Sequence, residues 1–128
     1  DEDLFESLEK ACKACNVRTG VFVSGIGMLK QAELSFYVKY GKYATVLFPD
    51  PLELVSLTGT VLLQEGEYKF HLHAILAKDT KEAVAGHLSS GKVNVTNEIM
   101  ILKSDIPAIR TLDEATGLMA LTFEQEKA

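Results

Sequence analysis

Positive charge is scarce in this sequence and is nowhere concentrated. The chain of 128 residues carries 13 lysines and arginines against 18 acidic residues, which gives a net charge of −5. No three basic residues follow one another, so the counterion release that drives binding to a nucleic-acid backbone has no evident source. We therefore expect weak or no binding to duplex DNA at physiological salt.

Long apolar runs are also missing, and cysteines are few. No apolar stretch approaches the roughly 20 residues of a membrane helix, which predicts no membrane segment. Cys12 and Cys15 form a C-x-x-C pair, but no second pair follows to complete a zinc site. The pair also ends a helical pattern, whereas a thioredoxin-like site begins one. We interpret the cysteines as small residues on one helix face, whose free thiols fit a reducing, cytoplasmic location.

What the sequence contains is one helical pattern followed by many short strand patterns. Its length predicts a single domain with a core of its own. Residues 3–15 carry the apolar stripe of an amphipathic helix, formed by Leu4, Phe5, Leu8, Ala11, Cys12 and Cys15.

The later segments alternate between strand formers and turn residues. Predicted strands include residues 21–23, 32–38, 43–48, 52–63, the histidine-bearing segment around 70–74, 93–102 and 118–123. Predicted turns lie at residues 25–27, 40–43, 49–51, 65–67, 79–82, 89–91 and 113–118. Strands joined by hairpins predict an α+β fold with a largely antiparallel β-sheet flanked by helices.

All three histidines fall in two short segments. His71 and His73 stand at i and i+2 in an apolar run typical of a strand, so their side chains point to the same face. His87 follows Gly86 a short way along the chain. Two neighbouring imidazoles with a third from an adjacent element supply most of a zinc site, which predicts that these three residues bind a metal.

Other interpretations of these motifs are available. The histidines could simply satisfy hydrogen bonds in a half-buried sheet. A cupin would place a glutamate shortly after His73, where this chain has Ala77 and Lys78. The serines lack the G-x-S-x-G context of a hydrolase nucleophile. The Gly25–Gly27 segment lacks the full G-x-G-x-x-G of a phosphate site and is better explained as a bend or bulge.

Five segments, in this order, carry a resemblance to a known family: 23–27 (Val-Ser-Gly-Ile-Gly), 52–59 (Leu-Glu-Leu-Val-Ser-Leu-Thr-Gly), 71–74 (His-Leu-His-Ala), 86–88 (Gly-His-Leu) and 96–98 (Thr-Asn-Glu). The set resembles the PPC domain, the "plants and prokaryotes conserved" domain, also called the domain of unknown function 296. The resemblance covers about residues 3–103, and residues 113–118 resemble the tail of stand-alone prokaryotic members. It implies one PPC-type domain over 1–128, with a core at about 3–103 and a C-terminal extension at 104–128.

The resemblance implies an antiparallel sheet flanked by helices and usually a homotrimer. It implies a three-histidine metal site, typically for zinc, on His71, His73 and His87. Glu53 is implied to face the same pocket or an interface, and Glu98 is a further candidate to orient the metal ligands. In plants the domain is joined to AT-hook segments that bind DNA, but this chain has no Arg-Gly-Arg-Pro core.

Three functional hypotheses follow. The first is a metal-binding, trimeric module that can also take a small-molecule ligand at the metal. The second is a zinc-dependent enzyme that acts on a small molecule, with Glu53 as general base. The third is a structural or regulatory domain, including the DNA-binding role that the family label suggests. Nothing in the sequence selects a substrate or a reaction.

Overall fold

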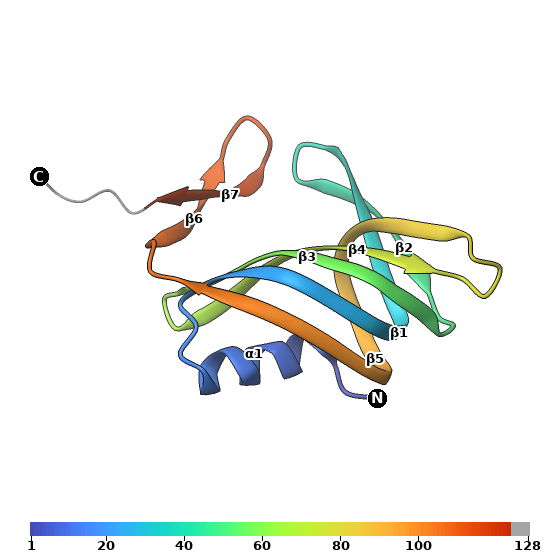
Figure 1. The fold of residues 1–128 in the computed structure, drawn as a ribbon. Coiled ribbons are helices and arrows are strands. Elements are labelled where there is room, and N and C mark those ends of the chain that lie inside the picture. The colour runs from blue at the N-terminus through green and yellow to red at the C-terminus, as the bar shows by residue number, and fades with distance from the viewer. Residues whose placement is uncertain (124–128) are drawn as a thin grey trace, which may run out of the picture.

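The computed structural model describes residues 1–123, and the end of the predicted C-terminal extension, 124–128, lies outside the described residues. Figure 1 shows the order of elements: α1 (Leu4–Ala14), β1 (Thr19–Lys39), β2 (Lys42–Phe48), β3 (Leu52–Gln64), β4 (Glu67–Ala77), β5 (Ala83–Ser104), β6 (Ala108–Asp113) and β7 (Leu118–Phe123). The predicted antiparallel sheet is confirmed. Within the described residues a single helix takes the place of the predicted flanking helices.

The helix α1 begins and ends where its capping residues allow. The Asp3 side chain accepts a hydrogen bond from the Glu6 amide at 3.0 Å and caps the N-terminus. Asn16, with a φ of 53°, turns the chain away after the last turn. Leu4, Leu8 and Cys12 are buried and join the core of the sheet.

No helix within residues 1–123 has the length and apolar character that crossing a membrane requires.

Four strands pair in a closed ring. β1 pairs with β3, β3 with β4, β4 with β5, and β5 returns to β1, while β2 extends the sheet from the second half of β1. Closure leaves few unpaired strand edges and bends the sheet around its interior. The core contains leucines and a valine that are at most 1% exposed, namely Leu29, Leu57, Val61, Leu72 and Leu76.

The predicted turns at residues 25–27 and 89–91 were wrong, because both segments lie inside long strands. β1 and β5 bend instead at irregularities in their register, two of which flank Ser24 and Gly27. Gly27 has a φ of 140°, and a Cβ there would overlap the carbonyl oxygen of Thr96. Glycine at this position therefore allows β1 to come close to β5, in agreement with the interpretation of this segment as a bend or bulge.

The other turns connect strands as predicted, and the last strand has an unexpected partner. Residues 40–41, 49–51, 65–66 and 78–82 join successive strands of the main sheet. The 118–123 segment is the strand β7, but it pairs with β6 in a separate two-stranded sheet and not with the main sheet. This β6–β7 hairpin folds back beside the turn between β1 and β2 (Figure 1).

Candidate metal centre

The register of the strands brings the three histidines together. His71 and His73 project from one face of β4, and Leu72 between them is buried on the other. β5 pairs with β4 so that His87 lies directly opposite His73. Because β3 and β1 hold the other sides of these strands, backbone pairing fixes the cluster. The predicted convergence of the three residues is observed.

The spacing of the imidazoles suits one metal ion. One possible ligand nitrogen from each ring lies within 4.8 Å of the other two. Ring centroids are 5.2 Å apart for His71 and His73, 5.3 Å for His71 and His87, and 5.7 Å for His73 and His87. Nitrogens on one tetrahedral zinc ion are about 3.3 Å apart, given zinc–nitrogen bonds of about 2.0–2.1 Å. Small side-chain rotations would place all three on a common ion.

The electrostatic environment keeps two of the imidazoles neutral. Burial lowers the pKa of His71, and the charge of Arg110 and the other two histidines lower it further. Burial and the neighbouring His73 lower the pKa of His87. Only a neutral imidazole can donate a lone pair to a metal, so these shifts favour the ligand form. The nitrogen donor set fits zinc or a similar transition metal and does not suit calcium or magnesium.

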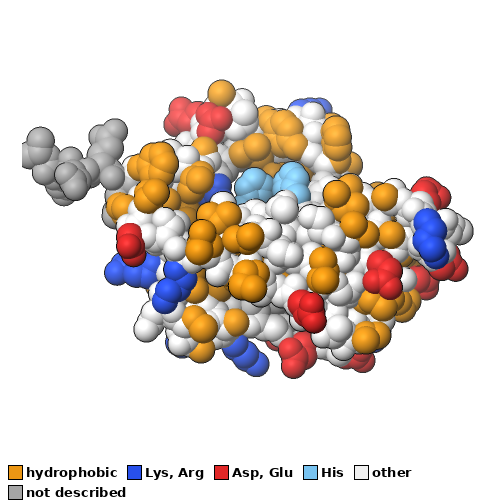
Figure 2. Space-filling model, in the orientation of Figure 1, with side chains coloured by type: hydrophobic (Ala, Val, Ile, Leu, Met, Phe, Trp, Pro, Cys, Tyr) orange, Lys and Arg blue, Asp and Glu red, His pale blue; other side chains and the backbone are white. Residues whose placement is uncertain are grey.

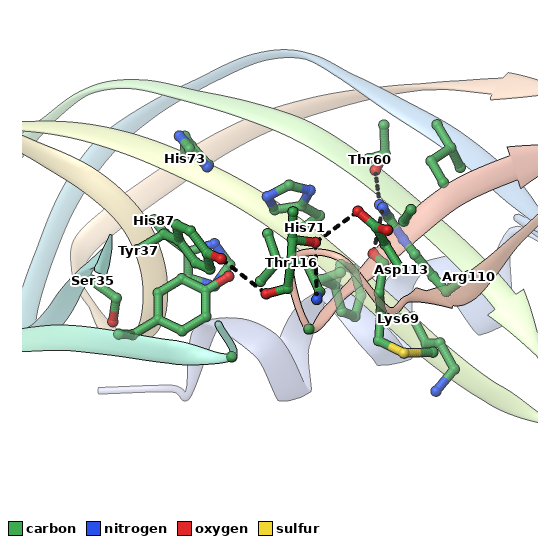
Figure 3. Close-up of a pocket in the computed structure, with 18 of the residues that line it drawn as sticks. Ser35, Tyr37, Thr60, Lys69, His71, His73, His87, Arg110, Asp113 and Thr116 are labelled. Carbon is green, nitrogen blue, oxygen red and sulfur yellow. Dashed lines mark hydrogen bonds between the residues drawn. The ribbon is translucent and has the colours of Figure 1, made fainter. Parts of the chain in front are cut away.

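The histidines lie on the floor of a cavity of about 1120 Å³. In Figure 2 they occupy a hollow bordered largely by apolar side chains. Figure 3 shows that the surrounding residues come from the main sheet on one side and from the β6–β7 hairpin on the other. Aromatic and aliphatic residues supply much of the lining, among them Tyr37, Tyr43, Leu118, Met119 and Leu121. A metal here would face a space large enough for a small molecule.

Two hairpin turns meet above this cavity. The Tyr37 hydroxyl and the Gly41 amide both donate to the Thr116 carbonyl oxygen, at 2.9 and 3.0 Å (Figure 3 for Tyr37). A Cβ at Gly117 would lie 2.8 Å from the Gly41 nitrogen and 3.1 Å from the Tyr40 ring. Glycine at this position therefore allows the close contact that joins the β6–β7 hairpin to the main sheet.

Arg110, in β6, reaches the same cavity and was not singled out by sequence. Its Nη2 donates to the Thr60 hydroxyl at 2.8 Å, and Thr60 is the β3 partner of His71 (Figure 3). The residue is only 8% exposed. The sequence feature that could have pointed to Arg110 is that the chain has two arginines and that this one lies in an apolar segment.

The two glutamates predicted near the metal do not reach it within one chain. Glu53 and Glu98 are both exposed, and neither lines the cavity. Glu53 lies five positions along β3 from Thr58, the partner of His73, which is about 17 Å at 3.4 Å per residue. Glu98 pairs with Ile26 near the far end of β5. A role for Glu53 at an interface stays a prediction.

The cysteines lie outside the cavity as well. Cys12 is buried, Cys15 is exposed, and both are free thiols. Burial, followed by the nearby Cys15, raises the pKa of Cys12, which disfavours the reactive thiolate. These observations agree with the interpretation of the pair as ordinary helix residues.

Comparison with known proteins identifies the family. Residues 1–105 match the Plants and Prokaryotes Conserved (PCC) domain. The chain is a PCC-domain protein. This is the family that the ordered motifs predicted, also abbreviated PPC.

Three solved structures share the fold over nearly the whole chain. A PPC protein from Pyrococcus horikoshii has a TM-score of 0.84 and 27% identity, covering 99% of this chain and 87% of that one. A protein from Archaeoglobus fulgidus, described as metal-containing, has a TM-score of 0.84 and 29% identity, covering 94% and 86%. One from Bacteroides thetaiotaomicron, described as a candidate DNA-binding protein, has a TM-score of 0.81 and 26% identity, covering 97% and 86%.

Among curated proteins, this chain also matches part of a longer protein. The bifunctional protein GlmU of Synechococcus sp. strain JA-2-3B'a(2-13) is 30% identical over 126 residues, which covers 96% of this chain. The chain spans 19% of that protein's length.

Proposed function

We propose that this PCC-domain protein binds one zinc ion per chain through His71, His73 and His87, and that it assembles as a homotrimer. The observation that carries the metal assignment is the convergence of three imidazole nitrogens within 4.8 Å on the floor of a cavity. The metal-containing relative from Archaeoglobus fulgidus supports the assignment. Three protein ligands leave one tetrahedral position for water or a small ligand, the pattern of reactive zinc sites.

The apolar outer surface of the ring supports assembly. Paired positions of β1 and β5 expose apolar side chains, including Val21 and its partner Leu102, while the alternating Phe22 is buried. Soluble monomers rarely expose large continuous apolar patches. The exposed set includes Val21, Val23, Ile26, Met100 and Leu102, each at least 45% exposed. Packing between three copies would remove this surface from water.

A zinc-dependent enzyme acting on a small molecule is the second candidate, and the size of the cavity favours it. Bound zinc would supply Lewis-acid chemistry and a water of lowered pKa. Glu53 is too far away to act as the base within the same chain. Asp113 is the carboxylate that lines the cavity, but it accepts hydrogen bonds from Ala115 and Thr116 in its own turn. The structure therefore favours ligand binding over an assigned reaction.

Metal content tests the first part of the proposal. We expect about one zinc per chain by mass spectrometry, on untagged protein purified without a nickel column. His73→Ala should retain less than about a tenth of that, because two nitrogens hold zinc poorly. Lys69→Ala, which changes a cavity residue that is not a ligand, is the matched control. Wild-type protein with less than about a tenth of an equivalent would refute the metal assignment.

Light scattering tests the second part. We expect three times the mass of one chain at micromolar concentration. Met100→Glu should dissociate the trimer, because it buries a charge in the contact. Ala11→Glu, on the exposed side of α1, is the control and should leave the mass unchanged. A monomeric wild-type protein would rule out the trimer.

A further inference from the structure

Arg110 is a buried cation in the wall of the cavity. It is 8% exposed, and its side chain contacts neutral groups: the Thr60 hydroxyl at 2.8 Å and, more weakly, the Met119 carbonyl oxygen at 3.5 Å. Burial lowers the pKa of Arg110, which reflects the cost of removing its charge from water. A guanidinium stays charged under these conditions and is most stable when an anion faces it.

Within residues 1–123 no carboxylate lies in ion-pair distance of this guanidinium. Asp113 shares the cavity wall, but its two oxygens accept hydrogen bonds from the Ala115 amide at 3.2 Å and from the Thr116 hydroxyl at 2.8 Å. Its carboxylate thus holds the turn between β6 and β7. Arg110 therefore has neutral hydrogen-bond partners but no counter-charge in this part of the chain.

The fold positions Arg110 firmly. The Gln64 side chain accepts from the Arg110 amide at 2.8 Å and donates to its carbonyl oxygen at 3.2 Å. The guanidinium lies close enough to His71 for its charge to lower the pKa of that imidazole. A fixed cation thus stands beside the three histidines, in the same cavity (Figure 3).

The remaining walls define the rest of the ligand. They are mostly aromatic and aliphatic, with Tyr43 packed on the His87 ring at a centroid distance of 5.3 Å. The charged residues lining the cavity are Arg110, Lys69 and Asp113. Lys69 lies 4.0 Å from the Glu67 carboxylate and Asp113 holds its own turn, so the one guanidinium of Arg110 is the charge that a ligand has to balance. A planar guanidinium matches a carboxylate with two parallel hydrogen bonds. A singly charged carboxylate balances this charge better than a dianionic phosphate does.

We propose that the cavity binds a small organic carboxylate, with its carboxylate on Arg110 and an apolar body against Tyr43 and the β6–β7 hairpin. The ligand would lie beside the histidines, so the inference deepens the proposed function and rests on it for the role of the metal. The pairing with Arg110 itself requires no metal.

The two arginines of the chain allow a direct test. A ¹⁵N spectrum of arginine side chains contains two Nε–Hε signals, from Arg110 and from the exposed Arg18. Phenylacetate added to the protein, both as purified and stripped of metal, should shift the Arg110 signal and leave Arg18 unchanged. Phenylacetamide, the neutral isostere, should bind about 10- to 100-fold more weakly, the value of hydrogen bonds to a charged partner.

Substitutions provide the second measurement. Arg110→Met should weaken phenylacetate binding by the same factor, Arg110→Lys by less, and the matched control Arg18→Met not at all. Two results on the wild-type protein would overturn the inference: equal affinity for phenylacetate and phenylacetamide, or an Arg110 Nε–Hε signal that phenylacetate does not shift. Neither result depends on whether the variants fold. Tighter binding of phenyl phosphate than of phenylacetate would overturn the choice of a carboxylate. Zinc content is measured in a separate experiment. A protein without zinc would refute the metal proposal, whereas a protein that does not bind phenylacetate at Arg110 would refute the carboxylate proposal.

Discussion

At the scale of single residues, the site depends on the protonation of its histidines. His71 and His87 have pKa values below the ordinary value of about 6.5 because burial disfavours their charged forms. In the metal-free protein both imidazoles should therefore titrate below pH 6.5, which ¹H NMR of the ring protons would measure. At the nitrogens of His71 and His87, protons should therefore compete with zinc at a lower pH than they would at an ordinary imidazole.

The same shifts fix the sign of a stability effect. Below about pH 6.5 the unfolded chain binds more protons at these positions than the folded chain, so the metal-free protein should lose stability as pH falls through this window. Arg110→Met should raise the pKa of His71 and leave that of His87 nearly unchanged, because the Arg110 charge is a cause of the first shift and not of the second. Equal movement of both values would show that the substitution had disturbed the cluster as a whole.

At the scale of elements, the contact between two hairpin turns joins the β6–β7 hairpin to the main sheet at the cavity. Gly117 has a φ of 72° and leaves no room for a Cβ against Gly41. Gly117→Ala should lower the free energy of unfolding by about 1–2 kcal/mol for the left-handed backbone alone, plus the cost of separating the turns. It should also speed hydrogen exchange of the Gly41 amide, which donates to Thr116.

Gly66→Ala is the matched control for this prediction. Gly66 has a similar φ of 78°, but no atom lies within 4 Å of the position that a Cβ would take there. The variant should therefore show the backbone cost without any change at Gly41 or in the histidine signals. If both variants destabilise the protein equally, the contact between the turns contributes nothing.

The elements show which parts of the fold local sequence can predict. Hairpin turns such as Tyr40–Gly41 and Glu65–Gly66 were predictable because turn residues separate two strand patterns. The length of β1 was not predictable. A glycine such as Gly27 is equally typical of a turn that ends a strand and of a place inside a strand where a neighbouring strand comes close. Only the position of Thr96 across the ring decides between them, and that is a long-range contact.

The same distinction holds for the site. His71 and His73 were predictable because strand alternation alone places them together, and His87 joined them through pairing with the adjacent strand. Arg110 was not predictable, since it enters the cavity on a hairpin that forms no pairs with the main sheet. Two hydrogen bonds with the distant Gln64 side chain, one accepted from the Arg110 amide and one donated to its carbonyl oxygen, fix the Arg110 backbone. No local pattern records such a contact.

At the scale of the whole molecule, charge argues against the DNA-binding hypothesis. Each chain carries a net charge of −5, and a trimer would carry three times that value. Phosphate binding needs several lysines or arginines on one surface, but Arg110 is buried and part of Lys69 lines the cavity. The candidate DNA-binding role of the Bacteroides relative is therefore not expected to extend to this chain.

We predict that this chain binds duplex DNA weakly or not at all at about 150 mM salt, near physiological ionic strength. A filter-binding titration of the zinc-loaded protein would measure this, with the same titration at about 50 mM salt to expose any electrostatic component. Assembly could bring scattered lysines onto one face, so the test uses the oligomer and not a dissociated variant. Saturable binding with a Kd below about 10⁻⁶ M, tighter than the usual non-specific range, would contradict the prediction and restore a DNA-binding function.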